Sequence, residues 1–249
     1  MRDVKPKRIR LEASSVCQLK CVLCSQSTGD IENSIIGKGF LKFFDFKKLI
    51  DDNPWIERIE LSNFGEIFLN PEILDIIRYG YERNLKLTAN NGVNLNNVTE
   101  EVLEGLVKYR FHSMTCSIDG CSNDTYSKYR IHGNYDAVIN NIKIINRYKE
   151  KYNSEYPLMR WQFIIFGHNE HEILEAKKKA KELNMKFNLK LNYNPEYSPI
   201  INTESIRNEL GGYASRDEFN EKMGELYTES ICKQLWDCPQ INWDGKVLG

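Results

Sequence analysis

Short runs of apolar and β-branched residues alternate along the chain with longer segments in which apolar positions recur at helical spacing. The short runs are typical of buried strands, and the longer segments are typical of amphipathic helices. The pattern predicts six strands, at residues 8–12, 56–61, 86–89, 113–118, 160–166 and 187–191. It predicts five helices between them, at residues 44–52, 71–83, 99–108, 135–152 and 170–183.

This alternation of strand and helix predicts a parallel sheet, because parallel neighbours need a crossover connection. We expect an α/β fold that forms a partial (β/α)6 barrel of the TIM type, followed by a short C-terminal appendage. The pattern loosens after about residue 198, and Gly211 and Gly212 stand among polar neighbours. We therefore predict a core at residues 1–214 and a small C-terminal unit at residues 215–249.

Polar or glycine-containing segments follow four of the predicted strands. In parallel barrels, the loops after the carboxyl ends of the strands meet at one rim and carry the active residues. We expect the segments 17–24, 63–66, 90–92 and 117–120 on this rim. These four segments are therefore the candidates for the functional site.

The composition is that of an ordinary globular protein, with 41% hydrophobic and 28% charged residues in a chain of 249. A formal net charge of −1 provides no strong field for nucleic acid or an anionic membrane, so we expect neither as a partner. The charged N-terminus lacks a signal-peptide pattern and no apolar run could span a membrane, so we expect a cytoplasmic protein. In that reducing compartment, the seven cysteines indicate metal ligands, catalytic thiols or buried residues rather than disulfides.

Cys17, Cys21 and Cys24 form the pattern Cys-x3-Cys-x2-Cys directly after the first predicted strand. Among seven cysteines, three fall at one preset spacing by chance in about half a percent of chains of this length. Three thiolates on one loop can hold an iron–sulfur cube and leave one iron without a protein ligand. A zinc site with a distant fourth ligand is the alternative.

The stretch LEASSVCQLKCVLC at residues 11–24 resembles the cluster loop of the radical S-adenosylmethionine (radical SAM) superfamily, whose usual motif is Cys-x3-Cys-x-aromatic-Cys. Leu23 occupies the usual aromatic position, and we expect it to lie at the cofactor. The resemblance implies that Cys17, Cys21 and Cys24 bind a [4Fe–4S] cluster whose open iron chelates S-adenosyl-L-methionine. Reductive cleavage then gives methionine and a 5′-deoxyadenosyl radical, which abstracts hydrogen from a substrate.

Other residues on the predicted rim also match this superfamily. Gly65 and Glu66, in the sequence LSNFGE, resemble its Gly-Glu motif, which implies that they hold the methionine amino group. The sequence SIDG that begins at Ser117 resembles the fourth-strand region of the branch with extra C-terminal clusters. That resemblance implies that Ser117 contacts the ribose and that Arg130 pairs with the methionine carboxylate, although a surface position for Arg130 is the alternative. From its position, Leu191 is expected to line the adenine pocket; no residue is assigned as a catalytic acid or base.

The stretch at residues 232–247 resembles the opening of a SPASM domain, an iron–sulfur module that binds auxiliary [4Fe–4S] clusters. Its Asp244-Gly245 pair predicts a hairpin on its own account. The next cysteine of the family pattern would fall one residue beyond the end of the sequence. We therefore expect an incomplete SPASM-like unit, in which Cys232 and Cys238 are auxiliary-cluster ligands only if the natural chain continues. A truncated module without a cluster, or two ordinary buried cysteines, is the alternative.

Together, these resemblances predict a radical SAM enzyme, an oxidoreductase or related, that receives its electron from an external donor of the flavodoxin or ferredoxin type. SPASM-type relatives modify peptides, protein side chains, sugars or small metabolites. Only about seven residues precede the first predicted strand, so we expect a small molecule or sugar in preference to a peptide. The alternative is a non-catalytic iron–sulfur or zinc protein that uses the cysteines for structure or electron transfer. Glu66, Ser117 and Arg130 distinguish the two, because an electron carrier needs no S-adenosylmethionine pocket.

Overall fold

The computed structural model describes residues 5–227 and 238–248, and its main feature is one sheet of eight strands. The strand order is β6-β5-β4-β3-β2-β1-β7-β8, so the first six strands lie in sequence order. Those six are parallel to one another. Their bounds are β1 Arg8–Leu11, β2 Arg58–Glu60, β3 Lys86–Val93, β4 Ser113–Ser117, β5 Leu158–Ile165 and β6 Lys186–Leu191.

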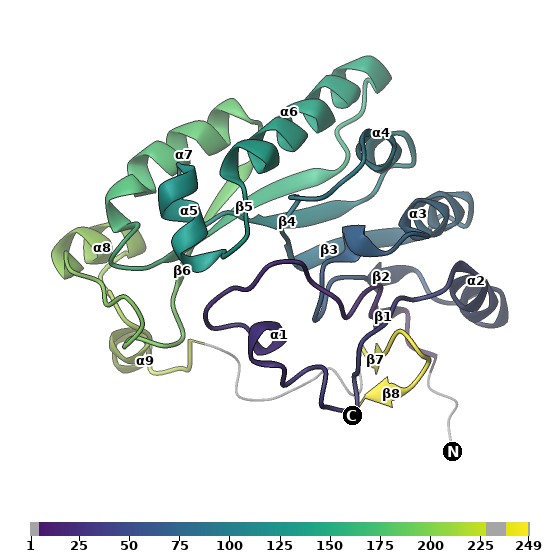
Figure 1. Ribbon diagram of the computed structural model, residues 1–249, viewed down its shortest axis with the longest axis horizontal. Helices are drawn as coiled ribbons and strands as arrows, with labels where there is room; N and C mark the ends of the chain where they lie inside the picture. The colour runs from purple at the N-terminus through teal and green to yellow at the C-terminus, as the bar shows by residue number, and fades with distance from the viewer. Residues whose placement is uncertain (1–4, 228–237, 249) are drawn as a thin grey trace.

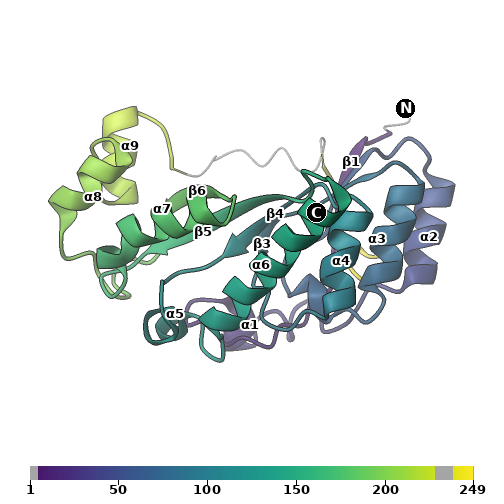
Figure 2. The ribbon, with the colours of Figure 1, turned by 90° about the horizontal axis from the view of Figure 1, so that it is seen from above.

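Helices cover one face of this curved sheet, as expected for a partial barrel (Figures 1 and 2). Its crossover helices are α2 Phe43–Asp52, α3 Ile73–Glu82, α4 Glu100–Lys108, α6 Tyr135–Tyr152 and α7 Ile173–Glu182. The short helix α1 (Ser25–Thr28) belongs to the loop on the opposite, concave side (Figure 1). Helix α5 (Asn123–Tyr129) follows β4, and helices α8 (Thr203–Leu210) and α9 (Arg216–Met223) follow β6.

The core lies between the sheet and its covering helices. Strand β5 shows this directly, because its buried residues alternate with more exposed ones. Side chains alternate between the two faces of a strand, so the buried set faces the helices and the other set faces the concave interior. The buried set consists of Met159, Trp161, Phe163 and Ile165, all members of the main hydrophobic cluster.

All six predicted strands and the five predicted helices are present, with shifted ends. Strand β3 is longer than predicted, since it continues to Val93. Asn90 and Asn91 resemble turn residues in sequence, but their backbone N–H groups donate to the Glu60 carboxylate of the neighbouring strand. The prediction missed the helices α1, α5, α8 and α9, which are short. None of the helices in the described ranges is long and apolar enough to cross a membrane.

The predicted hairpin around Asp244 and Gly245 is confirmed: β7 (Gln240–Ile241) and β8 (Val247–Leu248) are antiparallel, and Gly245 has a φ of 85°. Strand β7 pairs in parallel with β1 and thereby extends the main sheet. Trp243 connects the hairpin to the segment that follows α1, because its indole N–H donates to the Ile36 carbonyl at 2.9 Å. Cys232 lies outside the described residues, and the domain boundary after residue 214 stays a prediction.

Candidate cofactor site

The three cysteines of the triplet line one cavity of about 170 Å³ at the carboxyl ends of strands β1 to β4. The walls of this cavity come from all four segments that were expected on the rim. Among the lining residues are four others predicted for the site, Gly65, Glu66, Ser117 and Arg130. The structure therefore brings seven predicted residues, separated by more than one hundred positions in sequence, to one place. Their roles toward a cofactor stay predictions.

Hydrogen-bond donors point at two of the three sulfur atoms. Arg130 Nη1 lies 3.5 Å from Cys21 Sγ, and Asn94 Nδ2 lies 3.8 Å from Cys17 Sγ. Burial raises the pKa of the Cys17 thiol to about 12 and also raises the pKa of Cys21. These thiols are therefore neutral by themselves at neutral pH. A bound cationic metal group would reverse this preference, and the two donors would then stabilise the thiolates.

Arg130 reaches the cavity from the C-terminal end of α5 and is held by a buried carboxylate. Its Nε donates to Asp119 at 2.7 Å, and Asp119 also accepts a hydrogen bond from the Ile164 backbone at 2.7 Å. The Arg130 side chain is only 14% exposed, so the surface position considered as an alternative is wrong. A guanidinium has five donors, so the contact with Asp119 leaves others for a bound anion.

Glu66 is buried at the start of a 3-10 turn after β2. Its carboxylate accepts hydrogen bonds from the backbone N–H groups of Asn94 at 2.6 Å and Phe68 at 3.3 Å. Burial outweighs these bonds and raises the pKa of Glu66 to about 7. The carboxyl group therefore changes its charge near neutral pH, which matters for any ammonium group that it binds.

Gly65 occupies a position that no other residue fits. A Cβ there would lie 2.2 Å from the Ser14 carbonyl oxygen and 2.6 Å from the Val16 backbone. The family resemblance implies that Gly65 helps to hold the methionine amino group, and this role stays a prediction. The structure shows that this glycine allows close approach of the segment leading to Cys17, so Gly65 sets the position of the cluster loop.

No role was predicted from the sequence for three buried polar residues that organise the site: Glu12, Asn94 and Asp119, the last of which lies in the predicted rim segment 117–120. Glu12 follows β1 and accepts hydrogen bonds from the backbone N–H groups of Phe64 and Gly65, at 3.1 and 3.2 Å. Burial raises the pKa of Glu12 to about 8. A carboxylate directly after an apolar strand is the signal that could have identified Glu12. Nothing in the local pattern marks Asn94.

Leu23 and Leu191 do not line this cavity. Leu23 packs against a small apolar cluster that contains Leu19 and Phe166. Leu191 lines a separate hollow of about 300 Å³. Tyr193 lines the same hollow as Leu191, and its hydroxyl donates to the Leu23 carbonyl. Their contact with a cofactor stays a prediction, as does a ligand role for Cys238.

The donor set of the cavity fits an iron–sulfur cluster. Within residues 5–227 and 238–248, no group of three or more His, Cys, Asp or Glu side chains could hold a metal ion. The ligands of a [4Fe–4S] cube need not converge on one ion, because each thiolate binds a separate iron. Three thiols around one cavity, with donors aimed at two sulfurs, meet that requirement.

Comparison with known proteins supports the fold at low sequence identity. No protein-family model and no curated protein matches the chain. Among solved structures, Streptococcus suis SuiB bound to S-adenosylmethionine superposes with a TM-score of 0.69 at 14% identity, over 98% of this chain and 60% of SuiB. The chain thus spans less than two thirds of the length of SuiB.

Two further structures have the same fold. The enzyme anSMEcpe with bound AdoMet gives a TM-score of 0.58 at 15% identity, over 97% of this chain and 71% of that one. TsrM from Kitasatospora setae, a radical S-adenosylmethionine methyltransferase with cobalamin and a [4Fe–4S] cluster bound, gives 0.52 at 12% identity, over 81% and 37%. This chain therefore has the fold of the radical S-adenosylmethionine enzymes.

Proposed function

We propose that this chain is a radical SAM enzyme that binds a [4Fe–4S] cluster through Cys17, Cys21 and Cys24. The observation that carries the proposal is the single cavity that these thiols share with Glu66, Ser117 and Arg130. The bound cluster supplies the electron that cleaves S-adenosylmethionine to methionine and a 5′-deoxyadenosyl radical, which abstracts hydrogen from the substrate.

The residues of the chain bind and orient this cofactor. In its charged form, the Glu66 carboxylate accepts hydrogen bonds from the methionine ammonium group. Arg130 pairs with the methionine carboxylate, and Asp119 holds the guanidinium in place for it. The Ser117 hydroxyl bonds to the ribose. Gly92 makes room for that hydroxyl, since a Cβ at Gly92 would lie 2.8 Å from Ser117 Oγ.

The proposal includes an external electron donor of the flavodoxin or ferredoxin type and a substrate that is a small molecule or sugar. It also includes a cytoplasmic location and an oxidoreductase or related reaction. A SPASM-like C-terminal unit belongs to it as well, with Cys232 and Cys238 as ligands in a longer chain. The resemblance of residues 232–247 supports this last part.

Anaerobic reconstitution tests the function. Protein loaded with iron and sulfide is mixed with dithionite and S-adenosylmethionine, and 5′-deoxyadenosine is measured by chromatography. We expect product from the wild type and from Cys121→Ala, whose thiol lies outside the cavity, and none from Cys17→Ala. About four irons per chain are expected for the wild type.

Two results would favour the alternatives. A wild type that takes up iron but forms no more product than Cys17→Ala would indicate a non-catalytic iron–sulfur protein. A wild type that binds one zinc ion and no iron would indicate a structural zinc site.

A further inference from the structure

The concave face of β5 and β6 carries a strip of cationic and amide side chains. Parallel pairing sets Arg160 opposite Lys186 and Gln162 opposite Asn188, and Lys190 pairs with Ile164 further along. These residues occupy the alternate positions of both strands, while their neighbours pack on the helix side. No acidic residue occurs at these positions.

None of the five polar side chains of this strip is engaged by the described part of the protein. Within residues 5–227 and 238–248, no hydrogen bond or ion pair is made by any of these side chains. The five are those of Arg160, Gln162, Lys186, Asn188 and Lys190. Cations elsewhere on the chain do form pairs, as Arg207 does with Glu218 and Lys177 with Glu209. Arg160 and Lys186 are directly paired on adjacent strands and both are exposed, so two like charges lie side by side and are available to an anion from solution.

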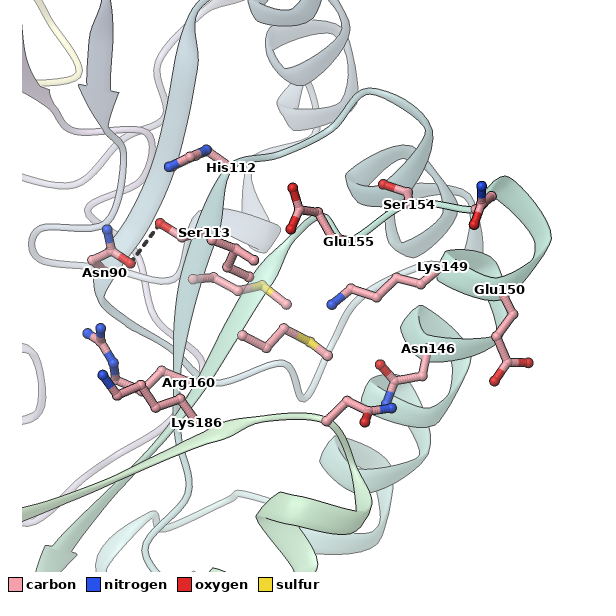
Figure 3. A pocket seen from close by; sticks show the side chains of 15 residues that line it. Asn90, His112, Ser113, Asn146, Lys149, Glu150, Ser154, Glu155, Arg160 and Lys186 are labelled. Atoms are coloured by element: carbon pink, nitrogen blue, oxygen red, sulfur yellow. Dashed lines mark hydrogen bonds between the residues drawn. The ribbon is translucent and has the colours of Figure 1, made fainter.

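The amino end of the strip opens into a hollow of about 1000 Å³. Figure 3 shows Arg160 and Lys186 side by side on one wall of this hollow, which Asn90 and Ser113 also line. The carboxylates that line the same hollow, those of Glu150 and Glu155, form no ion pair with either cation. On β6, the edge strand of the sheet, Lys186 and Asn188 are exposed.

The carboxyl end of the strip lies beside the cofactor site. Tyr193, three residues after Lys190, donates through its hydroxyl to the carbonyl of Leu23 in the cluster loop. Lys190 is half-buried. Burial and the nearby cations Arg216 and Arg130 lower the pKa of Lys190, and the Asp119 carboxylate opposes this in part. Within the described residues this half-buried ammonium has no direct ion-pair partner, so an anionic ligand would stabilise it.

We propose that the substrate is a phosphorylated or carboxylated small molecule that binds along this strip, with its anionic group on Lys190. Gln162 and Asn188 bind hydroxyl groups beside that anion. Arg160 and Lys186 attract the anion through the open hollow. This proposal rests on the proposed function, because the bound molecule is a substrate only if the chain is a radical SAM enzyme. The reacting carbon of that substrate must then lie next to the cofactor cavity.

Binding of simple anionic sugars tests the proposal without turnover. The probes are glucose 6-phosphate, glucuronate and uncharged glucose, added to cluster-loaded protein without reductant and followed by ligand-observed NMR. We expect the charged probes to bind and glucose to bind at least about tenfold more weakly, as for loss of a charge-assisted bond. Binding of only one charged probe would assign the anion as phosphate or as carboxylate.

Variants with matched charge changes locate the site. Lys190→Gln is expected to weaken the charged probes about tenfold, and Lys190→Arg to restore most of the affinity. Lys178→Gln, at an exposed position on α7, removes the same charge and is expected to change nothing. Thermal melting of each variant verifies folding.

Equal affinity for glucose and the charged probes would overturn the proposal, as would equal losses in Lys190→Gln and Lys178→Gln. Since no S-adenosylmethionine is cleaved in these measurements, such a failure leaves the proposed function standing. Absence of 5′-deoxyadenosine in the reconstitution assay would instead remove the proposed function and leave the anion site in place.

Discussion

The Arg130 guanidinium is held by the buried carboxylate of Asp119 at 2.7 Å and donates from its other side to Cys21 Sγ at 3.5 Å. One side chain thus connects the end of β4 with the cluster loop. Asp119 in turn is fixed by the Ile164 backbone of β5. The position of the arginine therefore follows from the sheet, and the same arginine orients one of the cysteines.

Replacement of Arg130 by alanine should destabilise the protein strongly. It leaves the buried Asp119 carboxylate without its cationic partner, and loss of one member of a buried ion pair costs about 3–5 kcal/mol. Urea unfolding of the metal-free protein measures this change. The control is Arg207→Ala, which breaks the exposed pair with Glu218 and should cost about 0–1 kcal/mol. Similar losses in both variants would contradict a structural role for the buried pair.

Gly65→Ala should displace the cluster loop. The added Cβ meets the backbone of Ser14 and Val16, which cannot rotate away as a side chain can. We expect a loss of about 1–3 kcal/mol, as for an overpacked core, together with reduced iron uptake. Thermal melting and iron analysis measure the two effects.

The matched control for this variant is Gly105→Ala in helix α4. The added Cβ there meets the flexible end of the Leu74 side chain, and alanine favours the helix. Its iron content should equal that of the wild type. If Gly65→Ala also kept full iron content, the tight contact would not control the loop.

Much of the fold was predictable because each strand is followed by an amphipathic helix with its own end signals. Thr99 illustrates this, since its hydroxyl accepts a hydrogen bond from the Val102 N–H as expected for an N-cap. The extension of β3 was not predictable, because it depends on the Glu60 carboxylate of another strand. The sequence around Asn90 does not indicate which residue of another strand will bind its backbone.

The candidate site also contains residues that local sequence predicts and residues that only the fold reveals. The rule that active residues follow parallel strands predicted a shared rim for the three cysteines, Gly65, Glu66 and Ser117, and the family resemblance added Arg130; all seven line one cavity. No role was predicted for Asp119 or Asn94, because their importance comes from contacts with Arg130 and Cys17 across the fold. The concave strip likewise becomes visible only when β5 and β6 are paired in register.

Glu12 should make the metal-free protein less stable as pH rises. Its pKa is about 8 in the folded chain, because of burial, against 4.5 for an ordinary glutamate. Below pH 4.5 the carboxyl is protonated in both states and has no effect. Between about pH 4.5 and 8 the unfolded chain releases this proton while the folded chain keeps it, so the free energy of unfolding falls. Above pH 8 the effect is constant.

Urea unfolding at several pH values measures this contribution. Glu12→Gln removes the titrating group, so its stability should vary less with pH between 5 and 8 than that of the wild type. Glu101→Gln, at an exposed position on α4, serves as the control and should follow the wild type. Parallel curves for wild type and Glu12→Gln would show that Glu12 does not titrate in this range.

Glu66→Gln should weaken the binding of S-adenosylmethionine to the cluster-loaded protein by about tenfold, since a charge-assisted bond to the ammonium group becomes a neutral one. In the wild type, the raised pKa of about 7 predicts that binding strengthens as pH rises from 6 to 8, because Glu66 gains its negative charge in that interval. The variant should lack this part of the pH dependence. Calorimetric titration without reductant measures both effects, and iron analysis verifies that the cluster is retained. An unchanged affinity and an unchanged pH profile in Glu66→Gln would place the methionine amino group elsewhere.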